Sequence, residues 1–253
     1  MSSVTQRISQ VKQPYGGYIK PSAFSVKVFD DGKVLNPAEN IHSSIVGLAV
    51  DYLSRFVISG NILKAFEISI RGAALANEAE TAGELLGKIR GTDFESVVSA
   101  CRLAGFDVWY RNPMYVLTHG VSEPTVPDDA TIENIQTMIE RSRKFFEEYG
   151  PVIQHGFTFE RDGYTLTVDA GDGDFLTENT LWDFKVSKNK LTSKQTLQLL
   201  MYWIMGQHSG QEIFKGITHL GVFNPRLNTM YKLDMAKVPA EVIHQVEDGV
   251  ICY

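Results

Sequence analysis

Apolar residues recur at helical spacing through most of the first half of the chain. The segment from residue 36 to about residue 56 begins Asn36-Pro-Ala-Glu39, where Asn36 can cap a helix, proline suits the first helical position and Glu39 can complete a capping box. Residues 1–35 before it form an irregular leader with a strand-like run at 24–29. We predict further helices in the mainly helical stretch that follows, at residues 65–76, 79–89, 93–104 and 131–149, with a turn-rich connection at 122–129.

From residue 151 the period of the apolar pattern changes from helical to alternating. Residues 152–159 and 164–168 alternate as strands do, and the turn between them contains Arg161-Asp-Gly163. This order of elements predicts an α/β protein with a mixed sheet flanked by helices, to which residues 36–150 add a helical part. The remaining strands of the sheet are predicted near 180–186, 218–223 and 230–233, and a helix is predicted at 193–206.

The totals are those of an ordinary globular protein. The chain has 253 residues, of which 43% are hydrophobic and 21% are charged. No apolar run approaches the roughly 20 residues that span a bilayer, and the N-terminus is polar, so we expect a cytoplasmic protein with no membrane partner. Without an internal repeat or a long linker, we expect one domain that consists of the leader at 1–35, the helical part at 36–150, a sheet-and-helix core at 151–235 and a C-terminal tail at 236–253.

Charge and cysteine content argue against several kinds of site. The net charge of −6 disfavours a protein that coats nucleic acid generally, although an acidic metal site can lie beside a local basic track. Cys101 and Cys252 are far apart in sequence and cannot supply a four-thiolate zinc or iron–sulfur site between them. The six histidines lack the spacing of a zinc hydrolase. We therefore expect neither a zinc nor an iron–sulfur protein.

Two aspartates and a lysine between residues 171 and 185 form the most informative pattern in the chain. Asp183 and Lys185 are two apart in an apolar strand, so both project from the same face of it. Asp174 follows a glycine-rich bend, and a hairpin between it and Asp183 can bring the two carboxylates together. Converging carboxylates repel unless a cation lies between them, and hard oxygen ligands select Mg²⁺ or Mn²⁺. Such an ion would bind a phosphodiester oxygen and activate water, and Lys185 would orient that water or neutralise charge at phosphorus.

The order of three motifs carries more weight than any one of them. A D-x-K pattern alone is weak, because Asp31-Gly-Lys33 also fits it in a predicted turn with no partner. In the second half, G-x-x-D at 171–174, D-x-K at 183–185 and Q-x-x-x-Y at 198–202 follow one another. This order resembles the RecB-like branch of the PD-(D/E)xK nucleases, which includes the CRISPR-associated RecB-like exonucleases, over about residues 150–235. The resemblance implies a restriction-endonuclease-like core in which Asp174 and Asp183 are metal ligands and Lys185 is the catalytic lysine. It also implies that Gln198 and Tyr202, on one face of a helix, position the site.

The chain departs from the family pattern in two places. Gly173 stands where the superfamily has its proline, a replacement that is common in this branch. Members of the branch also carry an early helical motif that supplies a further metal ligand. The nearest match is Gly47-Leu-Ala-Val-Asp51, which would make Asp51 a third ligand, with Glu39 and His42 as rivals. The iron–sulfur cysteines of some relatives are absent, so no cluster is expected.

The balance of charge changes sign along the predicted site. Residues 160–184 contain seven acids against one base, and residues 185–232 contain seven bases against one acid. An acidic metal site beside a basic flank suits a polyanion that is held by its backbone. Lys188, Lys190 and Lys194 are the candidate nucleic-acid-binding residues, the alternative being that 188–194 is a solvated loop.

The residues and the resemblance together predict a metal-dependent DNA nuclease that hydrolyses phosphodiester bonds with Mg²⁺ or Mn²⁺. The resemblance implies a role in DNA repair, phage replication or defence, with DNA, a helicase or other protein subunit, and a second copy of the chain as the partners to consider. The alternative is a catalytically inactive nucleic-acid-binding or assembly subunit with the same fold. Exonuclease or endonuclease action, and DNA or RNA as substrate, stay open, because the scissile phosphate is common to both polymers.

Overall fold

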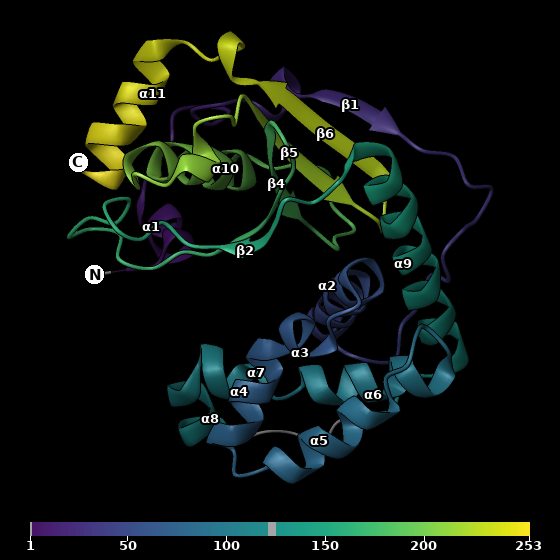
Figure 1. The fold of residues 1–253 in the computed structure, drawn as a ribbon. Coiled ribbons are helices and arrows are strands. Elements are labelled where there is room, and N and C mark those ends of the chain that lie inside the picture. Colours follow the sequence, from purple (N-terminus) through teal and green to yellow (C-terminus); the bar gives the residue numbers. More distant parts are fainter. Residues whose placement is uncertain (1, 121–124) are drawn as a thin grey trace. The chain divides into compact units, whose positions relative to one another are not determined.

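The computed structural model describes residues 2–120 and 125–253, and the chain divides into two compact units (Figure 1). Met1–Phe29 and Glu147–Tyr253 form the first, called the sheet unit, and Asp30–Phe146 form the second, called the helical unit. The boundaries of the helical unit lie close to those of the helical part expected at 36–150. Residues 121–124, which include the start of the turn-rich stretch predicted at 122–129, lie outside the described residues.

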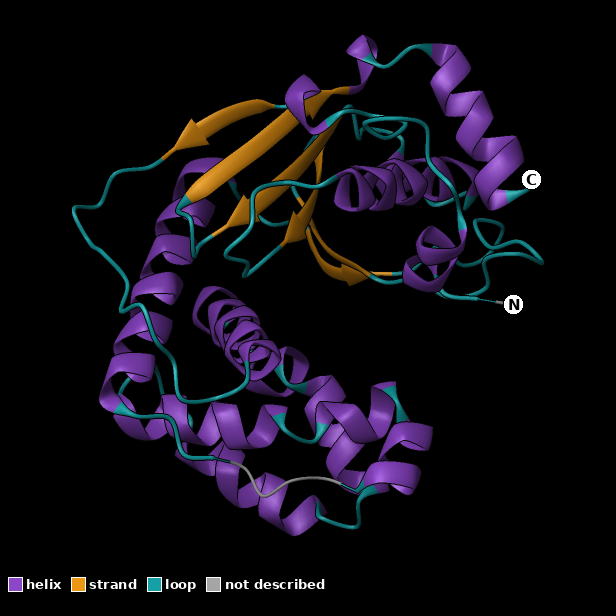
Figure 2. Ribbon diagram, turned by 180° about the vertical axis from the view of Figure 1, so that it is seen from behind, coloured by secondary structure: helices purple, strands orange, loops and turns teal. Residues whose placement is uncertain are grey.

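The sheet unit contains a mixed sheet flanked by helices, which confirms the predicted α/β class (Figure 2). Among the described residues the sheet has six strands in the order β1-β6-β5-β4-β3-β2. Neighbouring strands are antiparallel except β4 and β5, which are parallel. In chain order the strands are β1 (Ser25–Val28), β2 (Gln154–Phe157), β3 (Gly173–Leu176), β4 (Thr180–Phe184), β5 (His219–Asn224) and β6 (Thr229–Asp234).

Helix α10 (Ser193–His208) forms the crossover between the parallel strands β4 and β5 and packs against both. It begins after Thr192, whose hydroxyl accepts a hydrogen bond from the backbone N–H of Gln195, while the Gln195 side chain accepts one from the backbone N–H of Thr192. Helices α1 (Val4–Gln10) and α11 (Ala240–Val246) pack against α10 in turn (Figure 1). These contacts hold α10 firmly against the strand that carries Asp183.

A buried tryptophan fixes β4 between its two neighbouring strands. Trp182 is 1% exposed, and its indole N–H donates to the Thr177 hydroxyl at 3.0 Å. Its ring stacks on that of Phe175 in β3 and lies against Gly221, its partner in β5. A Cβ atom at position 221 would lie 2.2 Å from the ring, so this position requires glycine. The ring thereby locks the backbone that presents Asp183, the next residue in the strand.

Residues 164–168, predicted to be a strand, form a turn instead. The Thr165 hydroxyl accepts hydrogen bonds from the backbone N–H groups of Thr167 and Val168, and the Thr165 N–H donates to the Val168 carbonyl at 2.9 Å. A side chain that bonds its own neighbouring backbone competes with pairing in a sheet. The hairpin partner of β2 is therefore β3 rather than residues 164–168.

Residues 1–35 and 236–253 contribute helices to the core, contrary to the irregular leader and the tail expected from the sequence. Ser3 caps α1 in a capping box with Gln6, and α1 buries Val4 and Ile8. Helix α11 continues into a π-helical segment, Glu247–Ile251. The apolar side chains of this end are buried in the core of the sheet unit because they pack with α10 and α1; they are Val246, Val250 and Ile251.

The helical unit is formed by helices in the described part of residues 30–146, and the segments predicted at 65–76, 79–89, 93–104 and 131–149 are confirmed within a few residues. Among the described residues, no helix is long and apolar enough to cross a membrane. The helices are α2 (Ser43–Ser59), α3 (Ile62–Ala65), α4 (Glu67–Leu75), α5 (Ala79–Lys88), α6 (Phe94–Ala104), α7 (Asp107–Arg111), α8 (Pro113–His119) and α9 (Asp129–Tyr149), whose last turn belongs to the sheet unit.

Helix α2 begins at Ser43, so the start predicted at residue 36 is wrong. Its N-cap is His42, whose Nδ1 accepts a hydrogen bond from the backbone N–H of Ser44 at 3.3 Å. The backbone N–H of Asn36 instead donates to the Asn134 side chain of α9 at 2.7 Å. The apparent capping signal at 36–39 is thus used in tertiary contacts with α9, since Glu39 also accepts a hydrogen bond from Asn134.

Candidate active site

The β3–β4 hairpin brings the two predicted aspartates together. Phe175 pairs with Trp182 across the antiparallel hairpin. Asp174, the residue before Phe175, therefore lies opposite Asp183, the residue after Trp182. One carboxylate oxygen of Asp174 accepts a hydrogen bond from the backbone N–H of Phe184 at 2.7 Å. The two carboxyl groups are close enough for the charge of Asp174 to raise the pKa of Asp183. The prediction that a hairpin would join these acids is therefore confirmed in its geometry.

Asp183 is almost completely buried, with 2% of its surface exposed. Its Oδ1 atom lies 3.0 Å from Lys185 Nζ, whereas its Oδ2 atom is buried and has no hydrogen-bond partner among the described residues. The pKa of this carboxyl group is raised from 3.8 to about 7, mainly by burial and also by the charge of Asp174, while the ammonium group of Lys185 opposes the shift. A buried carboxylate oxygen without a partner is costly, which makes Asp183 an expected ligand for a cation.

Helix α10 supplies the other two predicted residues of the site. The Gln198 amide donates to the Tyr202 hydroxyl at 2.9 Å, one helical turn away. Tyr202 is 4% exposed, and its pKa is raised by burial and by the nearby charge of Asp183. The ring of Tyr202 packs against Phe157 and Phe159, so the hydroxyl is held in place. The structure therefore groups Gln198 and Tyr202 with the carboxylates of the hairpin.

The donor set fits a hard divalent cation. Asp174 and Asp183 offer carboxylate oxygens, and one of those oxygens is buried without a partner among the described residues. Among those same residues there is no cluster of three or more histidine, cysteine, aspartate or glutamate side chains arranged to hold a metal ion. Mg²⁺ is usually bound through one or two carboxylates, with water molecules and substrate phosphates completing its octahedral shell. Two carboxylates are therefore a sufficient protein contribution to a site for Mg²⁺.

The three candidates for a further metal ligand all lie in the helical unit, and each has a partner there. Asp51 on α2 forms a two-point ion pair with Arg55, with both N–O distances 2.8 Å. Glu39 accepts a hydrogen bond from Asn134, and His42 caps α2. Each side chain thus has a structural role within its own unit, and the two candidate metal ligands in the sheet unit are Asp174 and Asp183.

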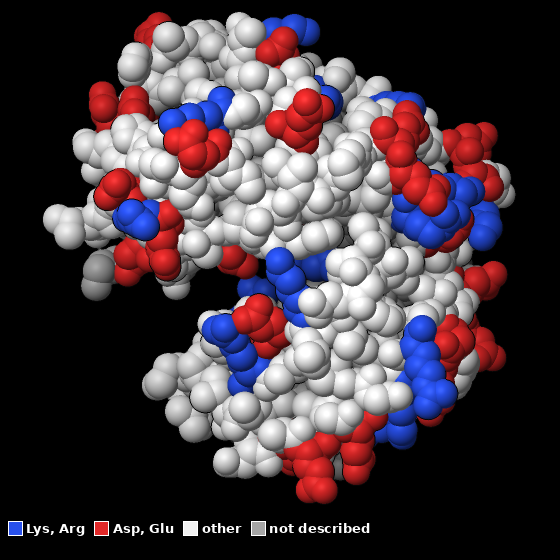
Figure 3. Space-filling view, in the orientation of Figure 1, with Lys and Arg blue, Asp and Glu red and all other residues white. Residues whose placement is uncertain are grey.

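Lys188, Lys190 and Lys194 are exposed at the loop after β4 and in the first turn of α10. None of the three forms an ion pair with a described residue. A lysine in the first turn of a helix is disfavoured by the helix dipole, so Lys194 does not stabilise α10 electrostatically. Over the face shown in Figure 3, acidic and basic side chains are interspersed, in keeping with a net charge of only −6. These lysines are available for phosphate contacts.

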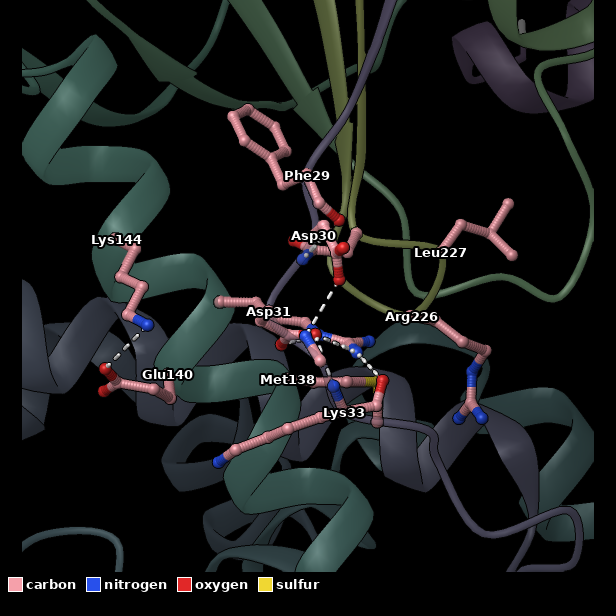
Figure 4. Close-up of polar contacts among 12 residues, drawn as sticks. Phe29, Asp30, Asp31, Lys33, Met138, Glu140, Lys144, Arg226 and Leu227 are labelled. Atoms are coloured by element: carbon pink, nitrogen blue, oxygen red, sulfur yellow. Dashed lines mark hydrogen bonds and ion pairs between the residues drawn. The ribbon is translucent and has the colours of Figure 1, made fainter.

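The second D-x-K pattern, at 31–33, lies in the helical unit, where its aspartate forms a structural ion pair with Arg141. Asp31 accepts two hydrogen bonds from the Arg141 guanidinium, at 2.7 and 3.0 Å, and Arg141 also donates to the Lys33 carbonyl. Figure 4 shows Asp31 and Lys33 beside helix α9. Arg141 holds the pKa of Asp31 below its usual value, the opposite of the shift at Asp183. The same sequence pattern therefore gives a satisfied carboxylate at one position and an unsatisfied one at the other.

Gly173 has a packing role that sequence reasoning missed. The ring of Phe157 in β2 lies over this residue, and a Cβ atom at position 173 would come within 2.0 Å of it. A proline at position 173 would meet the same ring. The sequence places an aromatic residue, Phe157, in the strand predicted at 152–159. Its contact with Gly173 could not be predicted, because that contact depends on the pairing of β2 with β3.

The site thus combines two close carboxylates, one ammonium group and a partly buried amide–phenol pair. Comparison with protein-family models, curated proteins and solved structures found no match to this chain. Any functional assignment therefore depends on the chemistry of these side chains and on the order of their motifs.

Proposed function

We propose that the chain is a metal-dependent DNA nuclease of the PD-(D/E)xK type, with a restriction-endonuclease-like core in the sheet unit. The observation that carries the proposal is the convergence of Asp174, Asp183 and Lys185 on one hairpin, with a carboxylate oxygen of Asp183 buried and unpartnered among the described residues. A structural ion pair would satisfy that oxygen, as Arg141 satisfies Asp31. An oxygen kept without a protein partner suits a site that binds a cation.

Each residue has a distinct task in this proposal. Asp174 and Asp183 would hold Mg²⁺ or Mn²⁺, which supplies Lewis-acid polarisation of a phosphodiester oxygen and of the attacking water. Lys185, 3.0 Å from Asp183 and 29% exposed, would hydrogen-bond the attacking water or neutralise charge that develops on the phosphate. Tyr202 and Gln198 would position the carboxylates from α10.

DNA binding would come mainly from phosphate contacts. Lys188 and Lys190 lie in the loop after β4 and Lys194 in the first turn of α10, and all three are exposed, so they can contact backbone phosphates. Such contacts read no sequence and weaken as salt concentration rises. The resemblance to RecB-like nucleases suggests a role in DNA repair, phage replication or defence, with a helicase or another subunit as partner.

Cleavage of defined substrates tests the proposal. The purified chain is incubated with linear duplex, closed circular and single-stranded DNA, and with RNA, in Mg²⁺, in Mn²⁺ and in a chelator. We expect phosphodiester hydrolysis of DNA that requires the divalent cation. Loss of linear substrate alone would identify an exonuclease, and nicking or linearisation of circles an endonuclease.

Two results of that assay would contradict the proposal. Cleavage that is unchanged in the chelator would show that Asp174 and Asp183 do not act through a metal. Binding of DNA without cleavage of any substrate would favour the alternative, a catalytically inactive nucleic-acid-binding or assembly subunit. Binding is measured in parallel by fluorescence anisotropy, so the two outcomes are separated.

A further inference from the structure

The helical unit contains a cavity of about 650 Å³ that has no part in the nuclease site. It is formed by the N-terminal part of α2, the end of α6, and helices α7 and α8. Its volume lies in the range of about 300–1,000 Å³ that small-molecule sites occupy. None of the residues Asp174, Asp183 or Lys185 belongs to this unit. The cavity therefore needs an account of its own.

The walls of the cavity are largely apolar and include three aromatic side chains. Phe106 and Trp109 come from the α6–α7 region, and Tyr115 comes from α8. Tyr115 is stacked on His119, with ring centroids 4.6 Å apart, which limits its motion. Aliphatic side chains of α2, among them Leu48, complete this part of the wall. Aromatic walls of this kind suit a flat ring system such as a nucleobase.

The charged groups of the wall favour an anion. Arg102 and Arg111 line the cavity, and Asp107 is the one acidic side chain among its described lining residues. Asp107 is 3% exposed and accepts hydrogen bonds from the hydroxyls of Tyr52 and Ser69, both at 2.5 Å, and from Arg111 at 3.3 Å. Its charge is thus already stabilised by three donors, two of which lie outside the cavity wall.

Arg102 is the distinctive feature of this wall. It is exposed at the end of α6 and forms no ion pair with any described residue. Two guanidinium groups beside one satisfied carboxylate leave an excess of positive charge in a mainly apolar space. Guanidinium groups match phosphate oxygens in geometry as well as in charge.

The geometry points to a binding site for a deoxynucleoside monophosphate, with the base among Phe106, Trp109 and Tyr115 and the phosphate at Arg102 and Arg111. A neutral apolar ligand would leave the two arginines unused, and inorganic phosphate would leave the aromatic walls unfilled. The cavity by itself carries the inference of a nucleoside monophosphate, and the choice of the deoxy sugar rests on the proposed function. If the chain also acts as an exonuclease, such nucleotides are products of its hydrolysis, and the cavity would sense them.

Isothermal titration calorimetry of the full chain tests this inference, with each of the four deoxynucleoside monophosphates, deoxyadenosine and inorganic phosphate as titrants. A chelator is present throughout, so that no phosphate is held through a metal at Asp174 and Asp183. We expect saturable binding of at least one nucleotide. The Arg102→Gln variant should weaken that binding at least about tenfold, because a charge-assisted hydrogen bond is lost. Trp109→Leu should weaken it by a similar factor, about that of one stacking contact.

Arg90→Gln is the matched control, because Arg90 is an exposed arginine of the same unit that does not line the cavity. It should bind the nucleotide as the wild type does. Since Arg102 is exposed, its replacement leaves the fold intact even if Trp109→Leu does not. Absence of binding for all four nucleotides overturns the inference, as does equal affinity for deoxyadenosine or for inorganic phosphate. An equal loss of affinity in Arg90→Gln and Arg102→Gln also overturns it. Failure of the nuclease assay has no bearing on these measurements.

Discussion

Replacement of Lys185 by alanine is expected to lower the rate of metal-dependent DNA cleavage by about two to three orders of magnitude. Lys185 Nζ lies 3.0 Å from Asp183 Oδ1, so its ammonium group can reach a water or phosphate oxygen at the same cation. Its side chain is 29% exposed, and its truncation therefore leaves no buried cavity. The rate is measured at saturating Mn²⁺ and DNA, so that the chemical step is compared rather than binding.

Lys215→Ala is the matched control for this prediction. Lys215 is a lysine of the same unit, 67% exposed, that pairs with Glu212 on the surface. Its replacement should leave the cleavage rate unchanged. A Lys185→Ala variant that cleaves at the wild-type rate would remove the lysine from the mechanism and, with it, the main reason to assign the D-x-K motif a catalytic role.

Replacement of Asp183 by asparagine is expected to have opposite effects on stability and on activity. In the absence of metal, the wild type buries a carboxylate with one unpartnered oxygen among the described residues, and the charge of Asp174 acts against it, whereas the amide of asparagine is neutral. The variant should gain about 1–3 kcal/mol in the free energy of unfolding at pH 8. It should also lose metal binding and cleavage. Such a trade between stability and function is common at active sites.

The gain in stability should depend on pH in a defined direction. The pKa of Asp183 is raised by burial from 3.8 in the unfolded chain to about 7 in the folded one. Between these values the folded wild type binds more protons than the unfolded chain, so its free energy of unfolding falls as pH rises from about 4 to about 7. The difference between Asp183→Asn and wild type should therefore be small near pH 4 and largest above pH 7, as measured by denaturant unfolding in a chelator.

Asp107→Asn provides a contrast for the same measurement. Asp107 is also buried, at 3% exposed, but its oxygens accept hydrogen bonds from Tyr52 and Ser69. Loss of that charge should destabilise the protein, because the charge-assisted hydrogen bonds weaken. If Asp183→Asn destabilises the metal-free protein as Asp107→Asn does, then Asp183 is a structural residue and the metal site is not supported.

The hairpin that carries Asp174 and Asp183 could be predicted from the sequence because its determinants are local. The two-residue spacing of Asp183 and Lys185 sets their common face, and the short connection to Asp174 sets the pairing of the strands. The helix that carries Gln198 and Tyr202 begins at a clear capping signal, Thr192 with Gln195. For these elements the local pattern and the tertiary contacts agree.

Other parts of the fold could not be predicted, because tertiary contacts override the local signals. Asn36 has the features of an N-cap, yet its backbone bonds to Asn134, about a hundred residues further along the chain. Residues 164–168 alternate like a strand, yet the Thr165 hydroxyl closes them into a turn. The burial of Asp183 and the cavity beside Arg102 arise only when separate helices and strands pack together.

The measurement that tests the central claim most directly is anomalous diffraction from crystals of the protein soaked in Mn²⁺. The account predicts an anomalous peak at bonding distance from carboxylate oxygens of both Asp174 and Asp183, and no such peak in crystals of Asp183→Asn. A fully soaked crystal with no peak between these two side chains, or with the same peak in the variant, would contradict the assignment of this hairpin as the metal site of a nuclease.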